Sequence, residues 1–251
     1  MKTKDEIHRN VFLNDEKGSP ASTHLNFSVS FLCKLLSYFF LTLLLFNMAV
    51  IIIRLYFGHD NLYGLTSFFD FNSENNLPTY FSSLMLFLSS CLLSVIAVTH
   101  KSNHASYRLW FVLAFIFLFL SLDEMASIHE MLSIPMRDML HASGLLYYAW
   151  VVPYGVALVI FVISYIKLLK NLPRNIMYLF LISGTLFVLG AIGFELIGGW
   201  YYELHGKSDL NYAILYTCEE SLEMLGVILF IYTLLLYMKM LAGEVRIRLN
   251  D

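Results

Sequence analysis

The sequence predicts an all-α, polytopic membrane protein: a bundle of about six transmembrane helices with both termini cytoplasmic. Three observations lead to this prediction. Only 14% of the residues are charged and 58% are hydrophobic, whereas an ordinary soluble domain carries roughly 25% charged residues. The few charges are missing from long windows of the chain, and Lys and Arg are unequally divided between alternate loops.

The windows of low charge have the length of transmembrane helices. A helix needs about 20 mostly apolar residues to cross the hydrocarbon core of a bilayer. Six windows approach or meet that length, at 31–54, 79–99, 108–129, 145–166, 176–200 and 213–240. A soluble helical protein would show an apolar face on each helix, whereas these windows are apolar all round. We expect no cleavable signal peptide in the polar N-terminal residues.

The basic residues predict the orientation of the bundle. With the N-terminus placed inside, 13 of the 16 Lys and Arg lie on the inner side, and Arg54, Arg137 and Lys207 lie outside. This distribution follows the positive-inside rule and predicts cytoplasmic termini, with the bacterial inner membrane as the expected location. We expect one transmembrane domain over 31–240, with an outer loop at 55–78 and polar cytoplasmic tails at 1–30 and 241–251.

The third window carries acidic residues at its outer end. Its uncharged stretch, Leu109–Leu122, has only 14 residues. To cross the hydrocarbon core, the helix must therefore take Asp123 and Glu124 into the membrane. At 100° per residue, Asp123, Ser127 and Glu130 are predicted to share one helix face.

The fifth window contains a single acidic residue, Glu195. Small residues let neighbouring helices approach closely in membranes. Four of them are predicted to lie on the face of Glu195, namely Gly184, Ala191, Gly198 and Gly199. Glu195 is therefore expected to point into the bundle and not toward lipid.

The sixth window opens with three glutamates, Glu219, Glu220 and Glu223, which fit within a helical arc of about 100°. Gly226 continues their face one turn deeper. With the acids of the third and fifth windows, seven carboxylates are predicted near the outer face. Each could simply cap a helix end in the headgroup region, but the agreement of faces on three helices favours a functional site.

Carboxylates and a histidine on facing helices are the ligands of carboxylate-bridged metal sites in helical bundles. We therefore predict a divalent metal ion as cofactor and assign a role to each residue. The predicted metal ligands are Asp123, His129, Glu130, Glu195, Glu219 and Glu223, and the predicted catalytic residues are Glu124 and Glu220. A site in the outer third of the bilayer is where a lipid or lipid-linked substrate would lie, which favours a metal-dependent membrane hydrolase, transferase or oxidase.

Two other classes of function compete with the enzyme. Intramembrane acids are typical of cation or proton transporters, channels and sensors, although the inner halves of these windows, such as Phe111–Phe119 and Val227–Leu236, carry no charge. A non-catalytic subunit of a membrane complex is the third class. Membrane lipid is the expected partner, an oligomer is compatible with the sequence, and no nucleic-acid partner is expected.

A further acidic segment precedes the second window. Oxygen-bearing side chains alternate along Asp70–Asn76 as they do in calcium-binding loops. The segment lacks the glycine and the full acidic spacing of an EF-hand. A polar turn before the helix that begins near Pro78 is therefore the favoured interpretation.

Several of these motifs occur together in a known group of proteins. Leu122-Asp-Glu, His129-Glu130 and the run from Glu219 to Gly226, Glu-Glu-x-x-Glu-Met-Leu-Gly, resemble a group of uncharacterised bacterial multi-pass membrane proteins. The resemblance covers most of the chain. It implies a multi-pass fold and brings no activity with it.

Overall fold

The computed structural model describes residues 28–58, 62 and 64–242. Within that part of the chain, every regular element is a helix and there is no strand. Six helices are long and apolar enough to cross a membrane, with mean hydropathies of 2.0 to 2.4. The predicted fold class is confirmed. The predicted tails lie almost entirely outside the described residues.

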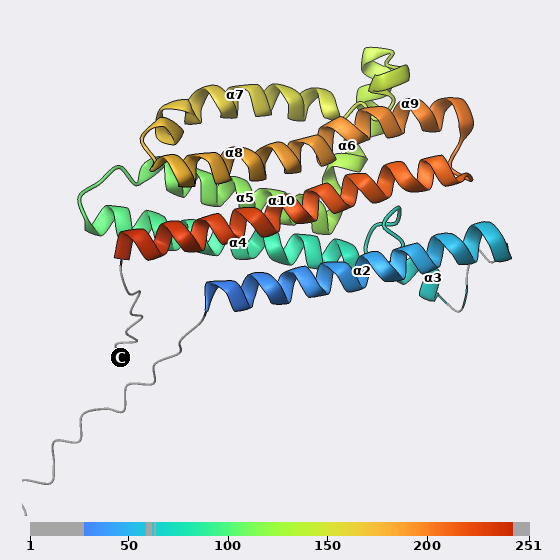
Figure 1. Cartoon of the computed structure of the whole chain (residues 1–251). Coiled ribbons are helices and arrows are strands. Elements are labelled where there is room, and N and C mark those ends of the chain that lie inside the picture. Colours follow the sequence, from blue (N-terminus) through green and yellow to red (C-terminus); the bar gives the residue numbers. More distant parts are fainter. Residues whose placement is uncertain (1–27, 59–61, 63, 243–251) are drawn as a thin grey trace, which may run out of the picture.

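The six spans follow one another through the chain, with three short helices between them (Figure 1). The spans are α2 (Val29–Phe57), α4 (Leu77–Ser102), α5 (Arg108–Ala126), α7 (Val151–Lys170), the run of α8 (Arg174–Val188), η2 (Leu189–Phe194) and α9 (Glu195–His205), and α10 (Leu210–Ala242). The short helices are α3 (Leu65–Phe69), α6 (Ile128–Leu140) and the 3₁₀ turn η1 (Gly144–Leu146). Helices of this length keep their backbone hydrogen bonds internal, as a bilayer requires.

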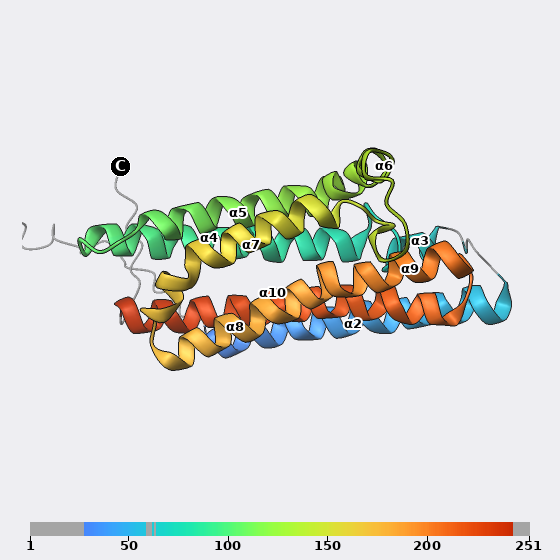
Figure 2. The same ribbon diagram turned by 90° about the horizontal axis from the view of Figure 1, so that it is seen from above.

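The spans form two layers of three helices, with α2, α10 and α8 in one layer and α4, α5 and α7 in the other (Figure 2). Helix α10 lies centrally and packs against α2, α8 and α4, while α5 packs against α4. The side chains of Met224, Ile231 and Leu234 on α10 are completely buried. Helix α10 is therefore the axis around which the bundle is built.

Serine hydroxyls join α4 to α5. The hydroxyl of Ser83 donates to the carbonyl oxygen of Ser121 at 2.7 Å, and that of Ser121 donates to the carbonyl oxygen of Ser83 at 2.9 Å. About two helical turns further along α4, the Ser90 hydroxyl donates to the carbonyl oxygen of Ala114 at 2.7 Å. Small hydroxyl side chains allow two helix backbones to approach closely in an apolar environment.

Two predicted spans have wrong boundaries. The predicted third span, 108–129, ends at Ala126, because Ser127 adopts a left-handed conformation with φ of 51°. The chain then turns sharply into α6. The predicted fourth span, 145–166, begins only at Val151 and extends to Lys170, since η1 and a turn occupy the residues before it.

The fifth span contains a π-helix, which no pattern in the sequence predicted. Its residues, Leu189–Phe194, lie directly before Glu195. A π-helical turn is wider than an α-helical turn, so it changes the register of the side chains on either side of it. Positions such as Gly184 and Glu195 consequently cannot be placed on one face by counting 100° per residue.

Candidate acidic site

The described acidic residues lie toward one end of the bundle, where α2, α5 and α9 end and α4, α7 and α10 begin. We call this end the acidic end. The opposite, basic end carries Lys101, Arg108, Lys167, Lys170, Arg174 and Lys239. The structure thus separates charges along the bundle as the sequence predicts, while the side of the membrane that each end faces stays a prediction.

Asp123 and His129 form a pair across the break between α5 and α6. Oδ1 of Asp123 accepts a hydrogen bond from the backbone N–H of His129 at 2.8 Å, and Oδ2 lies 3.5 Å from Nδ1 of the imidazole. The left-handed Ser127 makes this contact possible by folding the chain back on itself. The predicted common face of Asp123, Ser127 and Glu130 is therefore wrong, because the helix does not continue through Ser127.

The imidazole of His129 lies in a negative environment. Burial opposes its protonation, but the contact with Asp123 and the charges of Glu124 and Glu74 outweigh that cost and raise the pKa of His129 to about 9. On its other side, the ring packs against the indole of Trp150, with the ring centroids 4.8 Å apart. His129 is consequently the cation of the acidic site at neutral pH.

Glu195 begins α9 and is held by two side chains from other helices. Its Oε1 accepts a hydrogen bond from the indole Nε1–H of Trp150 at 2.6 Å. Its carboxyl group also lies close to the carboxyl group of Glu219 on α10. Glu195 therefore points into the bundle.

The remaining glutamates of α10 lie within electrostatic reach of Glu124 on α5. Glu223 lies within electrostatic contact of Glu124, Glu220 lies beside Glu223, and both are half-buried. Glu124 itself is also in contact with the hydroxyl of Ser82 on α4. These acids lie between the two layers of helices and not on the outside of the bundle.

Glu74 is a member of the site that the sequence prediction did not assign. Its Oε2 lies 3.4 Å from the hydroxyl of Thr79 and 3.5 Å from that of Ser127. Burial and the charge of Glu130 raise the pKa of Glu74. Its position within the polar segment 70–76 was the only available signal in the sequence.

The rest of that segment is structural, as the favoured interpretation predicts. The Asp70 carboxylate accepts a hydrogen bond from Arg54 at 2.8 Å. Asn76 caps α4, since its side-chain oxygen accepts from the backbone N–H of Thr79, and its amide donates to the carbonyl oxygens of Asp70 and Ser73. These bonds fix the turn and direct Glu74 toward α5.

Glu130 is exposed and lies at the margin of the site. The structure thus adds Glu74 to the predicted carboxyl groups, while Glu130 acts on Glu74 and Glu195 through its charge from the exposed margin. We call the following seven residues the acidic cluster: Glu74, Asp123, Glu124, Glu195, Glu219, Glu220 and Glu223. Each is within electrostatic contact of at least one other member.

The cluster does not present a ready-made set of metal ligands. Among the described residues, no three His, Cys, Asp or Glu side chains converge in a geometry that would hold a metal ion. The closest contacts are pairs, Asp123 with His129 and Glu195 with Glu219. Glutamate side chains would have to rotate about their side-chain bonds to enclose an ion.

The small residues at close contacts near Glu195 match the predicted ones only in part. Among the predicted glycines, Gly199 is tightly packed, since a Cβ atom there would lie 2.8 Å from the side chain of Tyr148. A Cβ atom at Gly190 would lie 2.7 Å from the backbone oxygen of Glu219, and one at Gly226 would lie 2.7 Å from the backbone nitrogen of Phe187. At Gly184 such an atom would meet nothing within 4 Å, and at Gly198 its nearest neighbour would be 3.9 Å away. The close approach of α8 and η2 to α10 therefore depends on Gly190 and Gly226.

Comparison with known proteins identifies a family and no activity. No curated protein and no solved structure matches the chain. Residues 37–238 match a family described as a domain of unknown function, DUF8692. The matched region contains the whole acidic cluster and parts or all of the six spans. The chain belongs to the DUF8692 family.

Proposed function

We propose that this multi-pass membrane protein binds a divalent metal ion in its acidic cluster and acts on a lipid or lipid-linked substrate at the outer face of the membrane. The observation that carries the proposal is the charge imbalance of the cluster. The cluster holds seven carboxyl groups from four segments, and five of them (Glu74, Asp123, Glu124, Glu195 and Glu223) lie within electrostatic reach of the imidazole of His129. Neighbouring cations are already engaged, since Arg54 pairs with Asp70 and Arg137 lies over the ring of Tyr147.

Such a cluster needs more positive charge than His129 supplies. Two like charges 4 Å apart repel by about 4 kcal/mol at an effective dielectric constant of 20. Carboxylates that share a partly buried site must therefore either take up protons or enclose a cation. Divalent ions with oxygen or mixed oxygen and nitrogen ligands suit a set of glutamates with one histidine.

The contact between Asp123 and His129 is compatible with a ligand role for His129, whose Nε2 would release its proton when the metal ion binds. Metal-bound histidines commonly donate their second ring nitrogen to a carboxylate, which orients the ring. Nδ1 of His129 faces Oδ2 of Asp123, which directs Nε2 to the opposite side of the ring. Asp123 then orients His129, and we assign the direct oxygen ligands to Glu195, Glu219 and Glu223.

Glu124 and Glu220 remain as bases for the reaction. A bound ion would supply Lewis-acid chemistry to an ester or phosphoryl group. Glu124 lies beside Glu223, where it could take a proton from an attacking water. The cluster lies at the end of α5, at the beginning of α9 and in the first half of α10, which favours a substrate that enters from the leaflet at the acidic end.

A second candidate function is a proton-sharing carboxyl network that serves a sensor or transporter. It is favoured by the closeness of Glu195 and Glu219, because two neighbouring carboxyl groups can relieve their repulsion by sharing one proton. The apolar inner halves of the spans favour sensing over conduction, since a pathway for ions would have to cross them.

Thermal unfolding of the purified protein in detergent distinguishes the two candidates. If a metal is bound, a chelator lowers the melting temperature and the correct ion restores it, with about 2.7 kcal/mol gained at a hundredfold excess over Kd. Glu223→Gln and Glu195→Gln should abolish the response to the ion. Asp138→Asn is the matched control, because Asp138 is an exposed acid of the same end.

A proton network gives a different result. The melting temperature would then change with pH and would not respond to chelators. The Glu195→Gln and Glu219→Gln variants would lose this pH dependence. If a chelator lowers the melting temperature, elemental analysis of the native protein identifies the bound ion. If neither chelator nor pH affects melting, and the Gln variants behave as Asp138→Asn does, the acidic residues are solvated helix ends and both proposals fail.

A further inference from the structure

Helix α6 leaves the bundle at a sharp angle. It begins one residue after the left-handed Ser127 and has 13 residues, a length of about 20 Å. In Figure 1 it runs across the direction of the six spans, and in Figure 2 it is seen nearly end-on beside them. If the spans cross a membrane, α6 therefore lies roughly in the plane of that membrane, at the acidic end.

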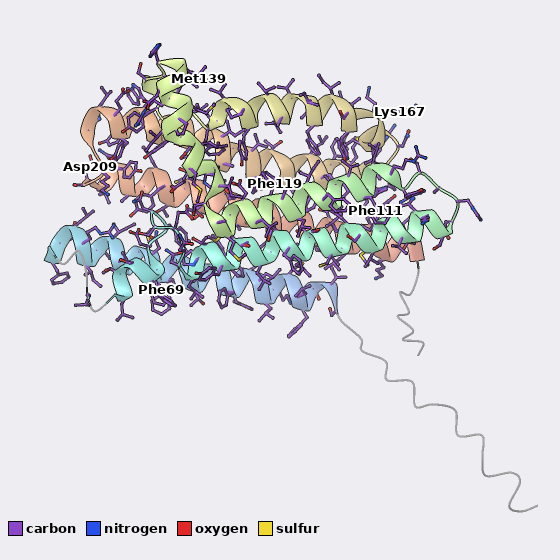
Figure 3. The ribbon with its side chains drawn as sticks, turned by 180° about the vertical axis from the view of Figure 1, so that it is seen from behind. Phe69, Phe111, Phe119, Met139, Lys167 and Asp209 are labelled. Carbon is purple, nitrogen blue, oxygen red and sulfur yellow. The ribbon has the colours of Figure 1, made fainter. Side chains whose placement is uncertain are left out.

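One face of α6 is largely apolar and is not covered by the described part of the chain, with the exposed Asp138 lying on it between Ile134 and Met131 in helical projection. None of its residues is buried. The most exposed large side chains are Met131 at 68%, Met139 at 66% and Ile134 at 62%. Figure 3 shows Met139 near the end of the helix that is farthest from the bundle. Exposure of these side chains to water would be unfavourable. Large exposed apolar patches usually mark a surface that contacts a protein, a ligand or a membrane.

The opposite face of α6 rests on the protein. His129 packs on Trp150, the guanidinium of Arg137 lies 4.5 Å from the ring centroid of Tyr147, and Leu132 and Met136 are partly buried. The helix thus has one side attached to the bundle and another side that nothing in the described chain covers.

The exposed face continues the lipid-facing surface of the spans. Leu122 and Met125 at the end of α5, before the helix, are exposed, as are Leu145 and Leu146 of η1 after it. Exposed apolar side chains are therefore found both at the end of a membrane-crossing helix and on the helix that lies across it, with the exposed acids Glu130 and Asp138 among them. A helix with one apolar face, positioned in this way, has the features of an interfacial membrane helix.

We propose that α6 is embedded in the boundary between headgroups and acyl chains of the leaflet at the acidic end, with Met131, Ile134 and Met139 in contact with lipid. The proposal is independent of what the acidic cluster binds. It has one consequence for the cluster: His129, in the first turn of α6, lies at the depth of the lipid headgroups.

Site-directed spin labelling of the full-length protein in phosphatidylcholine vesicles tests the proposal. Single cysteines replace Met131, Ile134 and Met139 in a background without Cys33, Cys91 and Cys218. Collision with oxygen, which dissolves in lipid, is compared with collision with a water-soluble nickel chelate. The references are Ile163→Cys on the exposed face of α7 and Lys207→Cys in the turn before α10.

The ratio of oxygen to nickel collisions should be several-fold higher at the three α6 positions than at position 207 and lower than at position 163. Ratios equal to that of position 207 would place the face in water and overturn the proposal. Low collision rates with both reagents would also overturn it, because the face would then be covered by protein, such as a second copy of the chain.

Discussion

The indole N–H of Trp150 donates a hydrogen bond to Oε1 of Glu195 at 2.6 Å, while the same indole packs on the imidazole of His129. Trp150 thus links two members of the site that come from different helices. Trp150→Phe keeps an aromatic ring and removes the donor to a half-buried carboxyl group. We expect it to lower the free energy of unfolding by about 1–3 kcal/mol in thermal melts.

Trp200→Phe is the control for this substitution, because Trp200 is exposed. Glu195→Gln retains an oxygen that accepts from Trp150 and should melt closer to the wild type than Trp150→Phe does. Identical melting of the two Trp variants would show that the hydrogen bond contributes nothing to stability.

The contact between α8 and α10 predicts contrasting effects for two glycines. Gly226→Ala would place a methyl group 2.7 Å from the backbone nitrogen of Phe187 and 3.0 Å from the backbone oxygen of Ser183. Neither backbone atom can move without separating the helices, so we expect a loss of about 1–3 kcal/mol. Gly184→Ala meets nothing within 4 Å and should be neutral or stabilising by about 0.5–1 kcal/mol.

Melting temperatures in detergent measure this difference. Gly198→Ala should also be tolerated, since the nearest atom would lie 3.9 Å away. If Gly226→Ala were as stable as Gly184→Ala, α8 and α10 would have to lie farther apart at Gly226 than the 2.7 Å contact with Phe187 implies.

The ion pair of Arg54 and Asp70 supports the turn that carries Glu74. The Asp70 side chain is 1% exposed and that of Arg54 is 30% exposed. Arg54→Met leaves a buried carboxylate without its partner, which we expect to cost about 3 kcal/mol. The double variant with Asp70→Asn should recover part of this loss in a double-mutant cycle. Additive effects of the two substitutions would contradict a direct interaction.

In the metal-free protein, where His129 is not a ligand, the charge of its imidazole predicts a loss of stability at alkaline pH. Its pKa is raised from 6.5 to about 9 in the folded protein. The stabilisation is therefore fully present below pH 6.5 and is lost as the pH rises through 9, with a total of about 3 kcal/mol. The melting temperature of the wild type should fall over this range. His129→Gln should start lower and fall less, and parallel curves for both proteins would rule out the proposed charge.

The orientation of the bundle can be tested with two exposed serines. Ser102 lies at the basic end and Ser208 at the acidic end. Single cysteines at these positions, without Cys33, Cys91 and Cys218, are treated with a membrane-impermeant maleimide in intact cells. The positive-inside rule predicts labelling at 208, and at 102 only after permeabilisation. Labelling at 102 in intact cells would place the acidic cluster on the cytoplasmic side.

The sequence alone determined the helical fold and the six spans, because the length of an apolar window is a local property. It also indicated that Asp123 and Glu124 enter the bundle, since 14 uncharged residues are too few to cross the hydrocarbon core. The separation of basic and acidic residues between the two ends of the bundle followed from counting residues in the sequence. These features need no knowledge of which helices are neighbours.

Only the tertiary structure decided which carboxyl groups meet. The left-handed Ser127 removes Glu130 from the face of Asp123, and the π-helix before Glu195 changes the register on which its small neighbours were predicted. Glu74 enters the cluster through hydrogen bonds that fix a turn far from α5 and α10 in the sequence. A constant 100° per residue describes an uninterrupted helix, whereas one left-handed residue or one wide turn redirects every side chain beyond it, and such breaks are set by packing against other helices.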